Sequence, residues 1–282
     1  MTRQYRGAMD QLERVQPDFD LAKIDPASTP GFVGDKRGAV LALTDNGARL
    51  GDLQERLYAE SKFGGTRRVL LVLQGMDTSG KGGIIRHVIG GTDPQGVALH
   101  SFKAPSVEER AHDFLWRIRA HLPGPGILGV FDRSHYEDVL IHRVRGLSTP
   151  EVIEARYGII SDFENDLAVT GTTIVKVFLH VSSAAQKARL TERLARPEKN
   201  WKFNPGDITE RQKWDAYQEA YQIALARTST PDAPWFVVPA DHKWYARWAV
   251  QHLLLTAMSA LNPQWPTVDY DVAAEQERLA AT

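Results

Sequence analysis

A glycine-rich loop directly after an apolar run constrains the fold of this chain more than any other feature. Residues 69–73 are uninterrupted apolar residues, as in a parallel strand that is buried on both faces. Residues 75–81, GMDTSGK, fit the pattern G-x-x-x-x-G-K, and a helix is predicted from 80 to 89. A strand, this loop and then a helix together predict a phosphate-binding P-loop, whose backbone N–H groups surround phosphate oxygens.

The loop also predicts a metal site of an unusual kind. Where a P-loop commonly carries Ser or Thr as a magnesium ligand, this chain has Gly82, so we expect the carboxylate of Asp77 to replace that hydroxyl. The alternative is that Asp77 only caps the helix. Lys81 supplies a movable positive charge for the transferred phosphoryl group. The loop residues expected to surround phosphate are Gly75, Thr78, Ser79, Gly80, Gly82 and Gly83.

Further apolar runs predict the rest of an α/β fold. Strands are expected at 97–102, 127–131, 173–181 and 235–238, with helices in the intervals, including one over 106–121. Strands that alternate with helices of this length form a parallel sheet covered by helices on both faces, here with five strands. Ligands of such folds bind at the carboxyl ends of the strands.

An Asp-Arg pair follows the predicted strand at 127–131. Asp132 lies where a Walker-B acid holds magnesium, so we expect it to share the metal with Asp77, while Arg133 clamps a phosphate. A structural salt bridge is the alternative for this pair. Residues 135–145 are predicted to form a helix in which Tyr136, Glu137 and Arg143 line an acceptor pocket, although Glu137 fits a solvated helix face equally well.

A basic and aromatic segment at 189–213 is predicted to be a lid over the loop. Arg189, Arg193 and Arg196 recur at helical spacing and would share one face, and Lys199 and Lys202 follow them. Such cations neutralise charge on the transferred group and exclude water. A charged, solvated helix is the alternative.

Composition limits the classes of function. The 282 residues include 43% hydrophobic residues, no cysteine and a formal net charge of −1, which excludes disulfides and cysteine nucleophiles and predicts no general attraction to nucleic acid. No apolar run approaches the length needed to span a membrane, so we predict a cytoplasmic protein. The predicted organisation is an N-terminal arm and helix over 1–63, with the helix at 46–62, a P-loop domain over 64–265, and a tail over 266–282.

Four motifs together resemble the family-2 polyphosphate kinases. They are GMDTSGKGG at 75–83, SFKAPSVEERAHDFLWRIRAHLP at 101–123, VFDRSHYEDVLIHRV at 130–144 and RPEKNWKFNPGDITERQKWDAYQEAY at 196–221. The resemblance covers residues 10–265. It implies the three-layer, thymidylate-kinase-like P-loop kinase fold with a helical lid, and reversible transfer of the terminal phosphoryl group of inorganic polyphosphate to nucleotides.

The resemblance also implies cofactors, acceptors and roles for individual residues. The motif YEDVL resembles that of the class that phosphorylates both AMP and ADP. The resemblance implies Mg²⁺ or Mn²⁺ as cofactor and a homo-oligomer, either a dimer or a tetramer. Asp77 and Asp132 would hold the metal, and Asp77, Lys81, Asp132 and Arg133 would be catalytic. Phosphate clamps would be Arg86, Arg193, Arg196, Lys199 and Lys202, and nucleotide-binding residues would be Lys103, Tyr136, Glu137 and Arg143.

Two other functions stay open on the residues alone. The first is an ATP-dependent nucleotide or nucleoside kinase on the same core, against which the basic lid, Arg86 and Lys103 favour a long polyanion as donor. The second is a binding module without catalysis, which the intact set of Asp77, Lys81 and Asp132 disfavours.

Overall fold

A parallel sheet forms the centre of the computed structural model, which describes residues 13–16 and 18–282. The strand order is β1-β6-β5-β2-β4-β3. The five parallel strands confirm the predicted sheet, and a two-residue β1 adds an antiparallel edge beside β6. The first twelve residues of the predicted arm lie outside the described residues. The strands are β1 (Glu13–Arg14), β2 (Arg68–Gln74), β3 (Val97–Ser101), β4 (Leu128–Asp132), β5 (Thr172–His180) and β6 (Trp235–Pro239).

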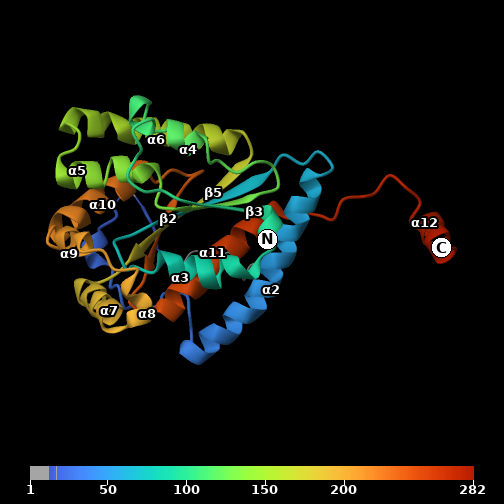
Figure 1. Ribbon diagram of the computed structural model, residues 1–282, viewed down its shortest axis with the longest axis horizontal. Helices are drawn as coiled ribbons and strands as arrows, with labels where there is room; N and C mark the ends of the chain where they lie inside the picture. The colour runs from blue at the N-terminus through green and yellow to red at the C-terminus, as the bar shows by residue number, and fades with distance from the viewer. Residues whose placement is uncertain (1–12, 17) are drawn as a thin grey trace.

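Helices cover the sheet on both faces, which gives three layers (Figure 1). On one face lie α2 (Lys36–Ser61), α3 (Lys81–His87) and α11 (Lys243–Leu261). The other face carries α4 (Trp116–Arg119), α5 (Ile141–Arg145), α6 (Pro150–Val169) and α10 (Trp214–Thr228). Because β2 lies in the middle of the sheet, its apolar residues are buried completely, as the uninterrupted run predicts.

The lid and the tail lie at opposite ends of the molecule in Figure 1. The lid consists of α7 (Ser183–Ala195), α8 (Pro197–Asn200) and α9 (Gly206–Arg211), beyond the carboxyl end of β5. The tail ends in α12 (Val272–Ala280), which stands apart from the body. None of the described helices is both long and apolar enough to cross a membrane. Short 3₁₀ helices connect the larger elements at Leu21–Lys23, Ile89–Gly91, Pro94–Gly96, Glu109–Ala111 and His135–Asp138.

The predicted helix over 106–121 is wrong. Its capping box does form, since Ser106 and Glu109 exchange hydrogen bonds of 2.6 and 3.1 Å between side chain and backbone. Only single turns follow, at Glu109–Ala111 and in α4. The side chains before Phe114 are largely exposed, and Val107 retains 78% of its accessible surface. Isolated turns are not stable without a buried face, so the cap starts a helix that does not continue.

Two other predicted helices have different bounds. The helix predicted at 46–62 begins ten residues earlier, at Lys36, because the Asp35 side chain caps it at the Gly38 amide and Ala39 is buried against the core. The helix predicted at 135–145 is divided into a 3₁₀ turn and α5. The carbonyl of Asp138 accepts a hydrogen bond of 2.8 Å from the Arg156 side chain, which stabilises the break.

Candidate active site

The loop between β2 and α3 has a backbone that only particular residues tolerate. Gly75 and Gly80 have φ values of 149° and 125°, and Thr78 has 62°. A Cβ atom on Gly75 would lie 2.7 Å from Ser79 Oγ and 2.9 Å from the carbonyl oxygen of Leu179. Glycine is therefore required at position 75 both for its φ and for the close approach of β5.

Lys81 begins α3 and folds back over the loop. Its Nζ donates to the carbonyl oxygens of Gly75, at 2.6 Å, and Met76, at 3.4 Å. Burial and the nearby Arg133 lower its pKa, while the carboxylates of Asp132 and Asp77 oppose that shift. The ammonium group thus lies among charges of both signs, where a phosphate group would add to the stabilisation of its charged form.

Arg133 joins the end of β4 to the loop. Its guanidinium lies 2.6 Å from Asp77 Oδ1 and 3.2 Å from Glu137 Oε2. Its φ of 65° is strained for a residue with a side chain, and such strain is common at functional sites. The carboxylates of Glu137 and Asp77 raise its pKa against the effect of burial, so the guanidinium is a permanent cation.

Several oxygens beside Lys81 fit a hard divalent cation. Asp132 Oδ1, Thr78 Oγ1 and Ser79 Oγ are buried and have no hydrogen-bond partner among the described residues. No group of three or more His, Asp or Glu residues able to hold a metal occurs in residues 13–16 and 18–282. Magnesium commonly takes one or two carboxylates and completes its shell with water and substrate phosphates, so Asp132 with Asp77 is a sufficient protein contribution.

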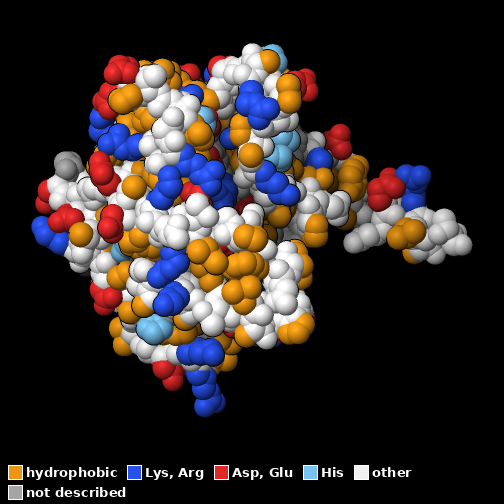
Figure 2. Space-filling view, turned by 60° about the vertical axis from the view of Figure 1, so that its left-hand side comes forward, with side chains coloured by type: hydrophobic (Ala, Val, Ile, Leu, Met, Phe, Trp, Pro, Cys, Tyr) orange, Lys and Arg blue, Asp and Glu red, His pale blue; other side chains and the backbone are white. Residues whose placement is uncertain are grey.

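A cavity of about 700 Å³ extends from the loop across the carboxyl ends of β3 and β4 to the lid. Ten Lys and Arg residues line it against four Asp and Glu residues, in a chain whose net charge is −1. Figure 2 shows Lys and Arg side chains gathered around a hollow on one face of the molecule. The cations that line the cavity are Lys81, Arg86, Lys103, Arg133, Arg189, Arg193, Lys199, Lys202, Lys243 and Arg247.

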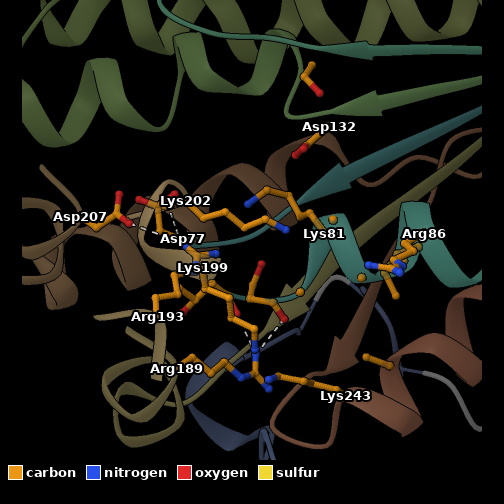
Figure 3. A pocket seen from close by; sticks show the side chains of 18 of the residues that line it. Asp77, Lys81, Arg86, Asp132, Arg189, Arg193, Lys199, Lys202, Asp207 and Lys243 are labelled. Atoms are coloured by element: carbon orange, nitrogen blue, oxygen red, sulfur yellow. Dashed lines mark hydrogen bonds and ion pairs between the residues drawn. The ribbon is translucent and has the colours of Figure 1, made fainter. Parts of the chain in front are cut away.

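The lid cations converge on the loop from α7 and the segment that follows it (Figure 3). Arg193 pairs with Asp207 at 3.5 Å, and Lys199 and Lys243 both contact Glu192, at 2.6 and 3.6 Å. These contacts hold cations from the lid and from α11 on one side of the cavity. A polyanion in the cavity would meet a surface on which the excess charge is positive.

Arg189 binds the backbone of the loop, whereas its helical spacing with Arg193 and Arg196 predicts only that it shares their face. It is 8% exposed, and its guanidinium donates to the carbonyl oxygens of Thr78 and Ser79, at 2.8 and 3.0 Å. It also donates to the carbonyl oxygens of Ala240 and Asp241. Since these four carbonyls take its donors, Arg189 braces the loop against α7 and the end of β6.

Five of the predicted site residues do not line this cavity, and three of them, Arg196, Tyr136 and Arg143, have their partners elsewhere. α7 ends at Ala195, so Arg196 leaves the face of Arg193 and pairs with Glu192 and Glu198, at 3.1 and 2.5 Å. Tyr136 is fully buried, and its hydroxyl contacts Glu164 of α6 and Lys176 of β5 in the core, so it cannot line an acceptor pocket. Arg143 pairs with Glu219 of α10 at 3.1 Å, outside the cavity.

The other predicted residues lie in or directly beside the cavity. Glu137 lies beside the cavity and forms an ion pair with Arg133, which lines it. Gly75 lies at the start of the loop, and its carbonyl accepts a hydrogen bond from Lys81. Sequence reasoning missed Asp207, Glu192, Lys243 and Arg247. Lys243 and Arg247 are four residues apart at the start of the helix that follows β6. Because ligands bind at the carboxyl ends of the strands, their position after β6 could have indicated that they line the site.

The family of the chain follows from comparison with known proteins. The family model described as Polyphosphate kinase 2 (PPK2) matches residues 35–266, which is most of the chain. The chain belongs to this family. The resemblance of the four motifs is thereby confirmed, and the P-loop, the acid of β4 and the basic lid all fall inside the matched residues.

Individual members of the polyphosphate kinase 2 family are similar over nearly the whole chain. The AMP/ADP-polyphosphate phosphotransferase of Meiothermus ruber is 49% identical over 255 residues, covering 90% of this chain and 94% of the relative. The ADP-polyphosphate phosphotransferase of Rhodopseudomonas palustris is 41% identical, covering 94% and 92%. The crystal structure of Polyphosphate Kinase 2 from Arthrobacter aurescens TC1 matches with a TM-score of 0.93 and 55% identity, covering 95% of each chain, which confirms the P-loop kinase fold.

Proposed function

We propose that this protein transfers the terminal phosphoryl group of inorganic polyphosphate to nucleotides, converting AMP to ADP and ADP to ATP, reversibly. The observation that carries the proposal is the cavity, whose ten cations continue past the loop to Arg86, Lys103 and Arg247. This path suits a polymer of phosphates better than a single triphosphate. The names of the relatives from Meiothermus ruber and Rhodopseudomonas palustris agree with polyphosphate and with these acceptors.

The residues divide the work of transfer between positioning and charge stabilisation. An oxygen of the acceptor phosphate attacks the terminal phosphorus, the bond to the next phosphate of the polymer breaks, and the polymer leaves one phosphate shorter. The loop backbone and Lys81 hold the transferred group, and Arg133 orients the acceptor phosphate beside Asp77. The lid residues Arg193 and Lys202 neutralise developing charge and exclude water.

The proposal includes a divalent cation, Mg²⁺ or Mn²⁺, held by Asp132 and Asp77. The unpartnered oxygens of Asp132, Thr78 and Ser79 support it. When bound, the ion would neutralise phosphate charge near the transferred group. We also propose that the protein is cytoplasmic and forms a homo-oligomer, either a dimer or a tetramer. Light scattering after gel filtration would measure the mass of this oligomer.

A matrix of donors and acceptors tests the proposed function. Purified protein receives polyphosphate or ATP as sole donor and AMP, ADP, GMP or GDP as acceptor, each with Mg²⁺ or Mn²⁺. We expect polyphosphate to phosphorylate AMP and ADP. Transfer from ATP alone would instead establish the ATP-dependent kinase, and absence of transfer from either donor would refute both enzymes.

A further inference from the structure

Two side chains of α7 bind three successive carbonyl groups of the loop between β2 and α3. Arg189 takes the carbonyl oxygens of Thr78 and Ser79. The carbonyl oxygen of Asp77 accepts a hydrogen bond of 3.1 Å from the side-chain amide of Gln186, which lies one turn earlier in α7. In a trans peptide the C=O and N–H groups point in opposite directions, so Gln186 fixes the direction of the Thr78 N–H group. Backbone N–H groups of this loop are the donors expected to bind phosphate.

The amide of Gln186 has a different partner at each end. Its side chain is only 1% exposed, so its polar atoms depend on partners within the protein. Its Oε1 accepts a hydrogen bond of 2.9 Å from Nη1 of Arg211, while its Nε2 donates to the Asp77 carbonyl. One buried side chain therefore joins Arg211 to the loop.

Arg211 determines which way this amide faces. It is the last residue of α9, and its guanidinium donates to the carbonyl oxygen of Ser183 at 2.7 Å and to the Ser183 hydroxyl at 2.8 Å. A guanidinium has donors and no acceptor, so it attracts the oxygen of the Gln186 amide and leaves the NH₂ group for the loop. Without Arg211, rotation of the amide would set its oxygen against the Asp77 carbonyl oxygen, and the hydrogen bond to the loop would be lost.

The contact reaches the reacting groups although neither side chain is one of them. Neither Gln186 nor Arg211 is among the described residues that line the cationic cavity. Asp77 does line it, and its carboxylate pairs with Arg133 at 2.6 Å. Thr78 follows with a φ of 62°, and a strained backbone of this kind persists only where the surrounding structure holds it. A shift of the Asp77 carbonyl would therefore move both a phosphate donor and a carboxylate of the site.

We propose that Gln186 is a positioning residue for phosphoryl transfer and that Arg211 acts through it, so that α9 sets the orientation of the peptide between Asp77 and Thr78. The inference deepens the proposed function and rests on it for the reaction that is positioned. It gives the lid a second role besides supplying cations. The loop has its full set of contacts only when the end of α9 lies against α7.

Substitutions of Gln186 separate the two ends of its amide. Gln186→Glu keeps an oxygen for Arg211 but replaces the donor to the Asp77 carbonyl with a second oxygen. We expect kcat for polyphosphate-dependent phosphorylation of AMP to fall on the order of 10²-fold, because small displacements of positioning groups have effects of this size. Gln186→Met keeps the volume of the side chain, removes both contacts and should lower kcat as well. KM for polyphosphate should change little, since the cations of the cavity are unchanged.

Gln251 on α11 provides the matched control. It is also 1% exposed, and its Nε2 donates to a backbone carbonyl, that of Leu43, at 2.9 Å, but it does not line the cavity. Gln251→Met and Gln186→Met should both lower the free energy of unfolding in urea, whereas only Gln186→Met should lower kcat. If Gln186→Met lost stability and kept its kcat, as the control does, Gln186 would be purely structural and the inference would be overturned.

A double-mutant cycle tests whether Arg211 acts through Gln186. Arg211→Met alone should lower kcat on the order of tenfold or more. Added to Gln186→Met, it should lower kcat no further, because the contact through which it acts is already absent. Effects of the two substitutions on kcat that multiply would overturn this part of the inference.

Hydrogen exchange of the loop gives a measurement that needs no substrate. Amides of the peptide spanning residues 75–81 should exchange on the order of tenfold faster in Gln186→Met and Arg211→Met than in the unmodified chain, and Gln251→Met should leave them unchanged. Unchanged exchange in both variants would overturn the inference. Faster exchange in a chain that transfers phosphate from neither polyphosphate nor ATP would support the positioning of the loop and contradict the proposed function alone.

Discussion

Substitution of Gly75 by alanine should damage both the stability and the activity of this protein. Position 75 combines a φ of 149° with a Cβ contact of 2.9 Å to the carbonyl of Leu179 in the central strand β5. The backbone conformation costs about 1–3 kcal/mol for a residue with a side chain, and overpacking against a rigid strand costs a further 1–3 kcal/mol or so. The alanine also lowers the conformational entropy of the unfolded chain, which offsets about 0.5–1 kcal/mol and leaves a net loss of roughly 1–5.5 kcal/mol in the free energy of unfolding.

Two other glycines separate the components of this loss. Gly64 has a φ of 89° and open space where its Cβ would lie, so Gly64→Ala should lose only the conformational part. Gly82 has open space and lies in the first turn of α3, so Gly82→Ala should be stabilised by about 0.5–1 kcal/mol. Urea unfolding measures the free energy of unfolding of each of the three variants. The expected order of stability is Gly82→Ala, then Gly64→Ala, then Gly75→Ala.

Activity provides the second measurement on the same variants. If the loop moves to accommodate the new methyl group in Gly75→Ala, the Gly75 carbonyl shifts away from Lys81 Nζ, now at 2.6 Å, and the phosphate cradle is lost. We expect polyphosphate-dependent phosphorylation of AMP to fall on the order of 10²-fold or more. Gly64 precedes β2, whereas the loop follows it, and Gly64 lies outside the cavity, so Gly64→Ala should keep its activity. A Gly75→Ala variant that matches Gly64→Ala in both stability and activity would refute the reasoning.

Three further outcomes are expected. Lys81→Ala and Asp132→Ala should each lower kcat/KM on the order of 10³-fold or more while far-UV circular dichroism stays native, and unchanged turnover in both would place the chemistry elsewhere. Glu164→Gln should lower the free energy of unfolding by about 3–5 kcal/mol, because Lys176, 2.5 Å away and fully buried, loses its counter-charge; adding Lys176→Met should restore most of it in urea titrations. Lys199, Lys243 and Arg196 hold the pKa of Glu192 at about 2 instead of 4.5, so the Tm advantage of the native chain over Glu192→Gln should be full above pH 4.5 and shrink as the pH falls toward 2.

Those features of the fold that depend on neighbouring residues were predictable from the sequence. The apolar run of β2 and the glycines after it allow few alternatives, since burial on both faces and positive φ values are properties of a short segment. The acid at the end of β4 was found in the same way, because parallel strands end at one edge. The four motifs identified the family because each is a short, continuous segment of the sequence.

Features that depend on where a segment ends or what it packs against were not predictable in this way. Helical spacing placed Arg189, Arg193 and Arg196 on one face, but α7 ends before Arg196, and Arg189 is drawn inward by loop carbonyls. The capping box at Ser106 forms without a long helix, because the side chains that follow it do not pack against the core.

The sequence by itself determined the P-loop, the five parallel strands, the two acids and the family, since each is encoded by local pattern. Only the tertiary structure decided which charges share a cavity, because Lys243 and Arg247 come from the far end of the chain and reach the loop through the packing of α11 on the sheet. It also decided that Tyr136 is a core residue and that Gln186 lies between Arg211 and the loop. Contacts between distant segments depend on the whole fold, and no local pattern specifies them.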